Sequence, residues 1–182
     1  PHPDDDVISM GGTFDRLVAQ GHEVHVAYQT SGNIAVSDDE ALKYVEVISD
    51  ISKDPHMYLD LKNELSHKEK NAVDSSDLRT LKGTIRKRES YAATRYLGIP
   101  DNQVHFLNLP FYESGKIKKN SPSQKDIDIT IKLIKSVKPH QIFAAGDLAD
   151  PHGTHRICLN ILFDSINQIK PESFMKHCWV WL

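Results

Sequence analysis

Two short segments carry side chains that can bind a metal ion and transfer protons. Residues 1–6 have the sequence PHPDDD, with one imidazole and three carboxylates next to prolines. Residues 150–155 have the sequence DPHGTH, which adds one carboxylate and two imidazoles. A divalent metal held by histidine and carboxylate, with a spare carboxylate beside it, is the minimal apparatus for hydrolysis. The two segments together therefore predict a metal-dependent hydrolytic site.

Each segment alone also has a plain structural explanation. Asp4, Asp5 and Asp6 lie at the start of a predicted helix, where acids stabilise the positive helix end. His152 and His155 can share one helix face, but surface histidines produce an H-x-x-H spacing by chance. The other histidines lie within or beside predicted strands or in a polar stretch, and we expect structural roles for them. Each segment is therefore informative mainly in combination with the other.

The elements that must position these segments alternate between helix and strand. Apolar residues at three- and four-residue spacing predict helices over residues 6–21, 38–51, 78–97, 123–137 and 155–169. Apolar runs and alternation predict strands over residues 22–30, 103–107, 140–145 and 176–182. This order predicts an α/β domain with a three-layer, mainly parallel sheet. Both donor segments fall where a strand should end and a helix begin, which is where ligands bind in open α/β sheets.

We expect residues 1–182 to form a single domain. Residues 52–77 are polar and rich in lysine without a long apolar period, so we expect an irregular insertion, with room for a short helix. The first residue already belongs to a donor segment, and residues 178–182 resemble a strand that stops in mid-run. We therefore expect both ends to be truncated relative to a longer chain.

Composition limits the class of protein. A chain of 182 residues with 39% hydrophobic and 26% charged residues can bury a core without disulfides. The net charge of -3 gives no electrostatic case for nucleic-acid binding, and no apolar run approaches the ~20 residues that cross a bilayer. The two cysteines, Cys158 and Cys178, do not suggest a disulfide framework and favour a reducing, cytoplasmic setting.

Several further motifs follow one another along the chain. They are HPDD at residues 2–5, MGGT at 10–13, RKRE at 86–89, LGI at 97–99, VHFLNL at 104–109 and HGTH at 152–155. Taken together they resemble the LmbE/PIG-L family of zinc-dependent de-N-acetylases, which act on N-acetylglucosaminyl compounds. The resemblance covers nearly the whole chain except residues 52–77. It implies a Rossmann-like, LmbE-type three-layer fold.

The resemblance also implies a role for each candidate residue. His2, Asp5 and His155 match the ligands of a zinc ion or another divalent metal, and a metal-bound water is then the nucleophile. Asp4 matches the general base that accepts the proton of that water. Two imidazoles and one carboxylate leave a coordination position open, as a catalytic zinc requires.

Two more residues are assigned in the same way. His152 matches the histidine that stabilises developing charge or donates a proton. Arg86 matches an arginine placed at the substrate, although it can equally belong to the solvated face of its predicted helix. The implied reaction is the removal of acetyl from an N-acetylglucosamine-type substrate.

Two positions depart from the family pattern. Asp6 stands where the family usually has Glu, which is compatible with a role as helix cap. Thr154 stands between the two late histidines where the family often has Asp, and Asp147 or Asp150 could supply that carboxylate instead. The change at Thr154 permits an alternative function as a weakly active or non-catalytic, sugar-binding or regulatory domain of a larger amino-sugar enzyme. The intact ligand set argues against that alternative.

The resemblance extends to partners and substrates. Family members also occur fused to a glucosamine-6-phosphate deaminase-like domain. In such a protein, a phosphorylated N-acetylglucosamine is a reasonable substrate, and the lysines within residues 116–119 could meet its phosphate. A metallophosphoesterase would need more bridging carboxylates than the sequence places. We expect a small-molecule amino sugar as the partner, and a homo-oligomer is an open alternative to a monomer.

Overall fold

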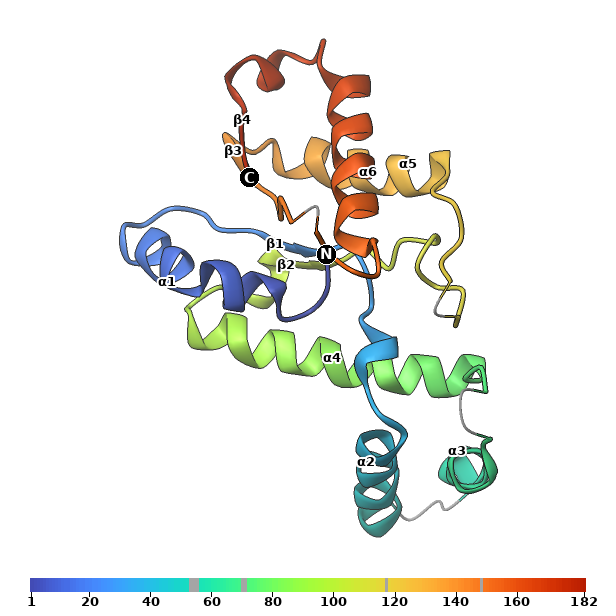
Figure 1. Cartoon of the computed structure of the whole chain (residues 1–182). Helices are drawn as coiled ribbons and strands as arrows, with labels where there is room; N and C mark the ends of the chain where they lie inside the picture. Colours follow the sequence, from blue (N-terminus) through green and yellow to red (C-terminus); the bar gives the residue numbers. More distant parts are fainter. Residues whose placement is uncertain (53–55, 70–71, 117, 148) are drawn as a thin grey trace.

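The computed structural model describes residues 1–52, 56–69, 72–116, 118–147 and 149–182 (Figure 1). The helices are α1 (Asp5–Ala19), α2 (Asp38–Ile51), α3 (His56–His67), α4 (Ser76–Tyr96), α5 (Gln124–Val137) and α6 (Thr154–Ile169). The strands are β1 (Val26–Tyr28), β2 (Val104–Phe106), β3 (Gln141–Phe143) and β4 (Trp179–Trp181). This mixture of helices and parallel strands confirms the α/β class.

The strands form two parallel pairs. Val26 of β1 lies opposite Val104 of β2, and Gln141 of β3 lies opposite Trp179 of β4. Within the described residues, each strand has a hydrogen-bonded neighbour on one side only. Each strand is three residues long and shorter than predicted. A strand extends only as far as a neighbouring strand forms hydrogen bonds with it. The described residues therefore show two small hydrogen-bonded sheets, and the single three-layer sheet predicted from the sequence stays a prediction.

Local sequence signals set the starts of the helices. Ser37 and Ser75 each accept a hydrogen bond from the backbone N–H three residues ahead, at the starts of α2 and α4. Ser123 and Asp126 form a capping box at the start of α5. Helix α2 has the predicted bounds, and the other four predicted helices agree within two residues at each end.

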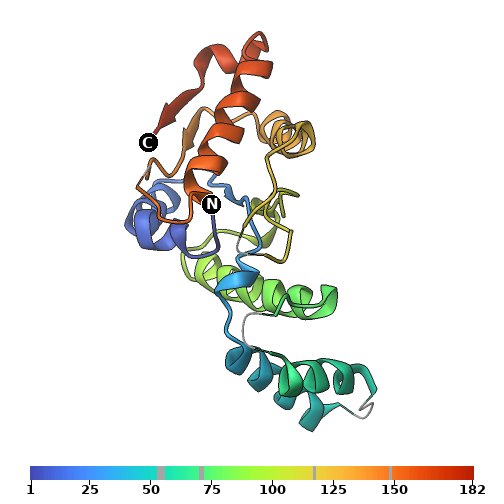
Figure 2. The same cartoon turned by 45° about the vertical axis from the view of Figure 1, so that its right-hand side comes forward.

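Two apolar clusters support the two donor segments. The first joins Phe14 of α1 to Val26 and Tyr28 of β1 and to Val104 of β2. The second joins α6 to the loop that follows β2. The starts of α1 and α6 meet between them, and the N-terminus lies beside the start of α6 in both views (Figures 1 and 2). Segments at opposite ends of the chain are thereby brought together.

The polar segment 52–77 contains α3, which packs against α2. Both views show this helix pair extending from the body beyond α4, away from the strands (Figures 1 and 2). Residues 53–55 and 70–71 of the segment lie outside the described residues. In the part of the chain that is described, no helix has the length and apolar character needed to cross a membrane.

Four charged side chains tie this helix pair to α4. Lys82 of α4 has a 5% exposed side chain and donates to Asp38 (2.6 Å) and pairs with Asp74 (2.9 Å). Lys68 contacts the same two carboxylates. Burial by itself raises the pKa of Asp38, but the hydrogen bonds from the two lysines hold it below its usual value. Lys82 lies one helical turn before Arg86, so the network steadies the helix that carries a candidate site residue.

Replacing Lys82 by Met is expected to lower the free energy of unfolding by about 2 kcal/mol. The substitution keeps the side-chain stem but leaves two carboxylates facing one lysine, and Asp38 is partly exposed, so the loss falls below that of a fully buried pair. Urea denaturation followed by circular dichroism measures the change. Lys43→Met, which removes an exposed ion pair with Glu40, is the matched control. An equal effect of the two substitutions would contradict the prediction.

Candidate metal centre

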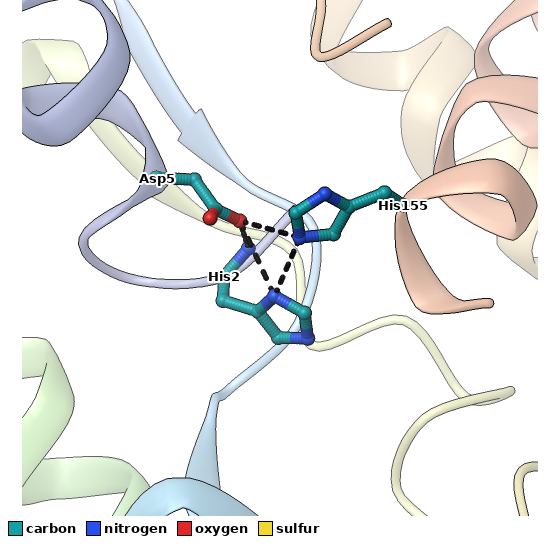
Figure 3. Close-up of side chains that lie close together, drawn as sticks. All are labelled: His2, Asp5 and His155. Atoms are coloured by element: carbon teal, nitrogen blue, oxygen red, sulfur yellow. Dashed lines mark hydrogen bonds and ion pairs between the residues drawn. The ribbon is translucent and has the colours of Figure 1, made fainter. Parts of the chain in front are cut away.

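Three donor atoms from the two segments converge on one point. His2 Nδ1, Asp5 Oδ2 and His155 Nε2 each lie 3.2 Å from the other two (Figure 3). Three atoms bound to a tetrahedral zinc at about 2.1 Å would lie about 3.4 Å apart. The donor set therefore fits a zinc-sized divalent ion, and it contains the three residues that the resemblance matched to ligands.

The fold holds the first segment in place from β1. The buried Thr30, just beyond β1, donates to the Pro1 carbonyl oxygen through its backbone N–H (3.0 Å) and its hydroxyl (3.1 Å). The His2 backbone N–H donates to Asp5 Oδ2 (2.7 Å), which closes a tight turn at the start of α1. Thr30, just beyond β1, therefore holds the segment that carries the His2 imidazole. Asp5, the first residue of α1, supplies the carboxylate.

The electrostatics of the cluster suit a cation. Burial by itself raises the pKa of Asp5, but the side chain and backbone N–H of His2 and the charge of His155 hold it well below the usual carboxyl range. Asp5 is therefore ionised at neutral pH, as a metal ligand must be. The second ring nitrogen of His155, Nδ1, is buried without a hydrogen-bond partner among the described residues. Asp147 Oδ2 lies 3.8 Å from it, on the side where a metal-binding histidine commonly donates to a carboxylate.

Asp4 directly precedes Asp5 but is not part of the donor triangle. Its φ of 109° belongs to a region that residues other than glycine rarely adopt, and such strain is typical of functional sites. Its Oδ2 accepts a hydrogen bond from Arg86 Nη2 (2.7 Å), and 48% of its side chain is exposed. Arg86 also donates to the Pro3 carbonyl oxygen and to Glu89. The structure thus places Arg86 against Asp4, and a substrate contact for Arg86 stays a prediction.

His152, the late histidine outside the donor triangle, is oriented by a buried carboxylate. His152 Nδ1 lies 2.6 Å from Asp150 Oδ1, and the Asp150 side chain is 2% exposed. Burial by itself raises the pKa of Asp150, but the backbone N–H groups of His155 and His152 and the charges of their rings lower it below its usual value. The His152 ring centroid is 5.8 Å from that of His2. Asp147 and Asp150 were the two candidates to supply the carboxylate that the family often has at position 154. Asp150 contacts His152, and Asp147 lies nearer His155.

Asp6 does not cap α1 as expected. It lies in the first turn of α1, and its Oδ2 accepts a hydrogen bond from the Tyr28 hydroxyl (2.6 Å). Burial and this hydrogen bond raise the pKa of Tyr28 above its usual value. Asp6 therefore links α1 to β1, because the neighbouring strand offers it a donor that the helix position alone does not reveal.

Tyr112 is a site neighbour that the sequence did not identify. It lies in the loop after β2, and its ring meets the His2 ring at 5.7 Å between centroids with an interplanar angle of 65°. Burial raises the pKa of Tyr112 to about 12. An aromatic residue in an irregular loop carries no periodic signal, so its place beside His2 is visible only in the folded chain.

Comparison with known proteins agrees with this geometry. Residues 1–166 match the model of the PIG-L family, described as GlcNAc-PI de-N-acetylase. The match spans most of the chain and includes every donor atom of the cluster. The chain therefore belongs to the PIG-L family, which points to a hydrolase of the deacetylase type.

A longer relative gives the domain its context. Over 193 aligned residues, the chain is 49% identical to a glucosamine-6-phosphate deaminase-like protein of Bacteroides thetaiotaomicron. The alignment covers 100% of this chain and 29% of that protein, so the chain spans less than a third of the relative's length. No solved structure matches the chain. The relative is consistent with a fusion of a PIG-L domain to further sequence.

Proposed function

We propose that this domain is a metal-dependent hydrolase that removes acetyl from an N-acetylglucosamine-type substrate. The observation that carries the proposal is the donor triangle of His2, Asp5 and His155, with Asp4 directly before Asp5 in the chain and outside the triangle. We propose these three residues as ligands of Zn²⁺ or another divalent metal. When bound, such an ion polarises the amide carbonyl and lowers the pKa of a water molecule.

Residues of the chain perform the proton transfers. Asp4, held by Arg86 and exposed beside the ligands, accepts the proton of the attacking water as general base. His152, oriented by Asp150, stabilises the developing negative charge on the carbonyl oxygen or donates a proton to the departing amine. Asp150 keeps the His152 ring in one orientation, which leaves Nε2 free for that role.

The substrate class rests on two related descriptions. The family is described by a de-N-acetylase of GlcNAc-PI, and the longer relative is named for glucosamine 6-phosphate. Both descriptions name a hexosamine: the first is N-acetylated, as the substrate of the proposed reaction would be, and the second has the free amine that its product would have. We therefore propose an N-acetylated amino sugar as substrate and an amino sugar with acetate as products.

We also propose that residues 1–182 form one LmbE-type domain of a larger protein. Supporting this, β1–β2 and β3–β4 are both parallel pairs, and the starts of α1 and α6 meet between the two apolar clusters. The two pairs would then be parts of one mainly parallel sheet with helices on both faces, the three-layer arrangement of the resemblance.

An acetate-release assay with N-acetylglucosamine and its phosphates tests the function. We expect turnover by the zinc-loaded protein, loss of turnover after chelation, and recovery when zinc is restored. A protein that binds zinc and these sugars but releases no acetate would instead be the non-catalytic sugar-binding domain. The absence of both zinc binding and turnover would refute the proposal.

A further inference from the structure

Lys119 is a half-buried cation near the candidate metal centre. Its Nζ lies 4.0 Å from the centroid of the Tyr112 ring and donates to the Lys116 carbonyl oxygen at 3.4 Å. Burial lowers the pKa of Lys119, and the negative charge of Glu113 opposes that shift. Within the described part of the chain, Lys119 forms no ion pair. The ammonium group is therefore partly stripped of water, and the charge of Glu113 offsets that cost only in part.

The loop that carries Lys119 is held against the core. The Phe111 backbone N–H donates to the buried Asp126 (2.9 Å), and the Asn120 backbone N–H donates to the Phe111 carbonyl oxygen (3.0 Å). Asn120 directly follows Lys119, so the bond to Phe111 fixes the backbone there. The loop therefore holds the ammonium group near Tyr112 before any ligand binds.

Tyr112 connects the ammonium group to the metal centre. One contact of its ring is with Lys119 and another is with the His2 ring, at 5.7 Å between centroids. Arg86, the guanidinium that contacts Asp4, is already paired with the carboxylates of Asp4 and Glu89. Lys119, which has no ion pair among the described residues, therefore has charge available for an incoming anion.

We propose that Lys119 binds a phosphate monoester on the substrate, so that the centre selects phosphorylated N-acetylated amino sugars over neutral ones. The proposal rests on the proposed function, because it assumes that the amide end of the sugar lies at the donor triangle. An ammonium group is a point-charge ligand for phosphate, and its hydrogen bonds to that group are charge-assisted. A bound phosphate would pair directly with Lys119, as no carboxylate of the described residues does.

The test compares kcat/KM for N-acetylglucosamine, its 6-phosphate and its 1-phosphate. We expect the protein to prefer one of the two phosphates, and Lys119→Met to lower the ratio of that phosphate to the neutral sugar by about tenfold or more. Lys119→Arg should restore most of the preference because it keeps the cation. Lys125→Met is the matched control, since Lys125 is exposed on α5, outside the loop.

Calorimetric titration with glucosamine 6-phosphate, glucosamine 1-phosphate and glucosamine separates this proposal from the proposed function. If a phosphorylated amine binds more tightly than glucosamine and Lys119→Met abolishes this difference, the phosphate site is supported even if no acetate is released. Equal affinity for the phosphorylated and neutral amines would overturn it. So would a preference that Lys119→Met leaves intact or that Lys125→Met removes equally.

Discussion

Replacing His155 by Ala is expected to remove bound zinc and hydrolytic activity together. His155 Nε2 is one corner of the donor triangle, 3.2 Å from both His2 Nδ1 and Asp5 Oδ2. If the unmodified protein binds about one zinc ion per chain, the variant should retain almost none. Only two protein ligands remain in the variant, whereas catalytic zinc sites have three. The loss of several kcal/mol of transition-state stabilisation corresponds to a decrease in kcat/KM of about a thousandfold or more.

Elemental analysis after gel filtration and the acetate-release assay measure the two effects. His152→Ala is the informative companion, because His152 belongs to the same segment but not to the donor triangle. It should retain zinc while turnover falls. His22→Ala, at an exposed position after α1, should change neither property. Full zinc content in His155→Ala would rule out the assigned ligand set.

Candidate donor residues could be selected from the sequence because residue type carries donor chemistry, and the family resemblance matched His2, Asp5 and His155 to metal ligands. Imidazole and carboxylate side chains at residues 1–6 and 150–155 limit what the site can do, and the predicted helix starts place both segments at element ends. The partners of those residues were not predictable in the same way. Asp150 contacts His152, and Asp6 accepts from Tyr28, because of how loops and strands pack around each helix start.

The helices could be predicted from local sequence, whereas the extent of the strands could not. The five predicted helices were placed within two residues because their apolar period and capping residues are local properties of the sequence. The strands were overestimated because pairing depends on distant segments. The alternating run of residues 22–30 supplies a three-residue ladder where Val26 to Tyr28 meet Val104 to Phe106. The alternation within one segment does not reveal how many of its residues pair with a neighbouring strand.

Replacing Asp4 by Asn is expected to reduce kcat by about 10²–10⁴ while zinc content stays unchanged. Asn has nearly the same size and tolerates the positive φ at this position, but it does not accept a proton as a carboxylate does. KM should change little because the substitution removes a proton acceptor and keeps the surrounding geometry. Steady-state acetate release and elemental analysis measure the three quantities.

The matched control for this substitution is Asp15→Asn, which removes an exposed carboxylate from the same helix. Turnover, zinc content and thermal stability should be those of the unmodified protein. If Asp4→Asn kept wild-type turnover with full zinc, Asp4 would not be the general base.

The Arg86 contact allows a sharper version of the same test. If Arg86 acts by holding Asp4, Arg86→Gln should lower kcat in the protein with Asp4 and have little further effect once Asp4 is Asn. The double variant would then be far from additive. If Arg86 instead binds substrate directly, Arg86→Gln should raise KM in both backgrounds and the effects should add. The guanidinium bonds to Asp4 and to the Pro3 carbonyl oxygen favour the first result, in which a strained turn and its basic partner work as one unit.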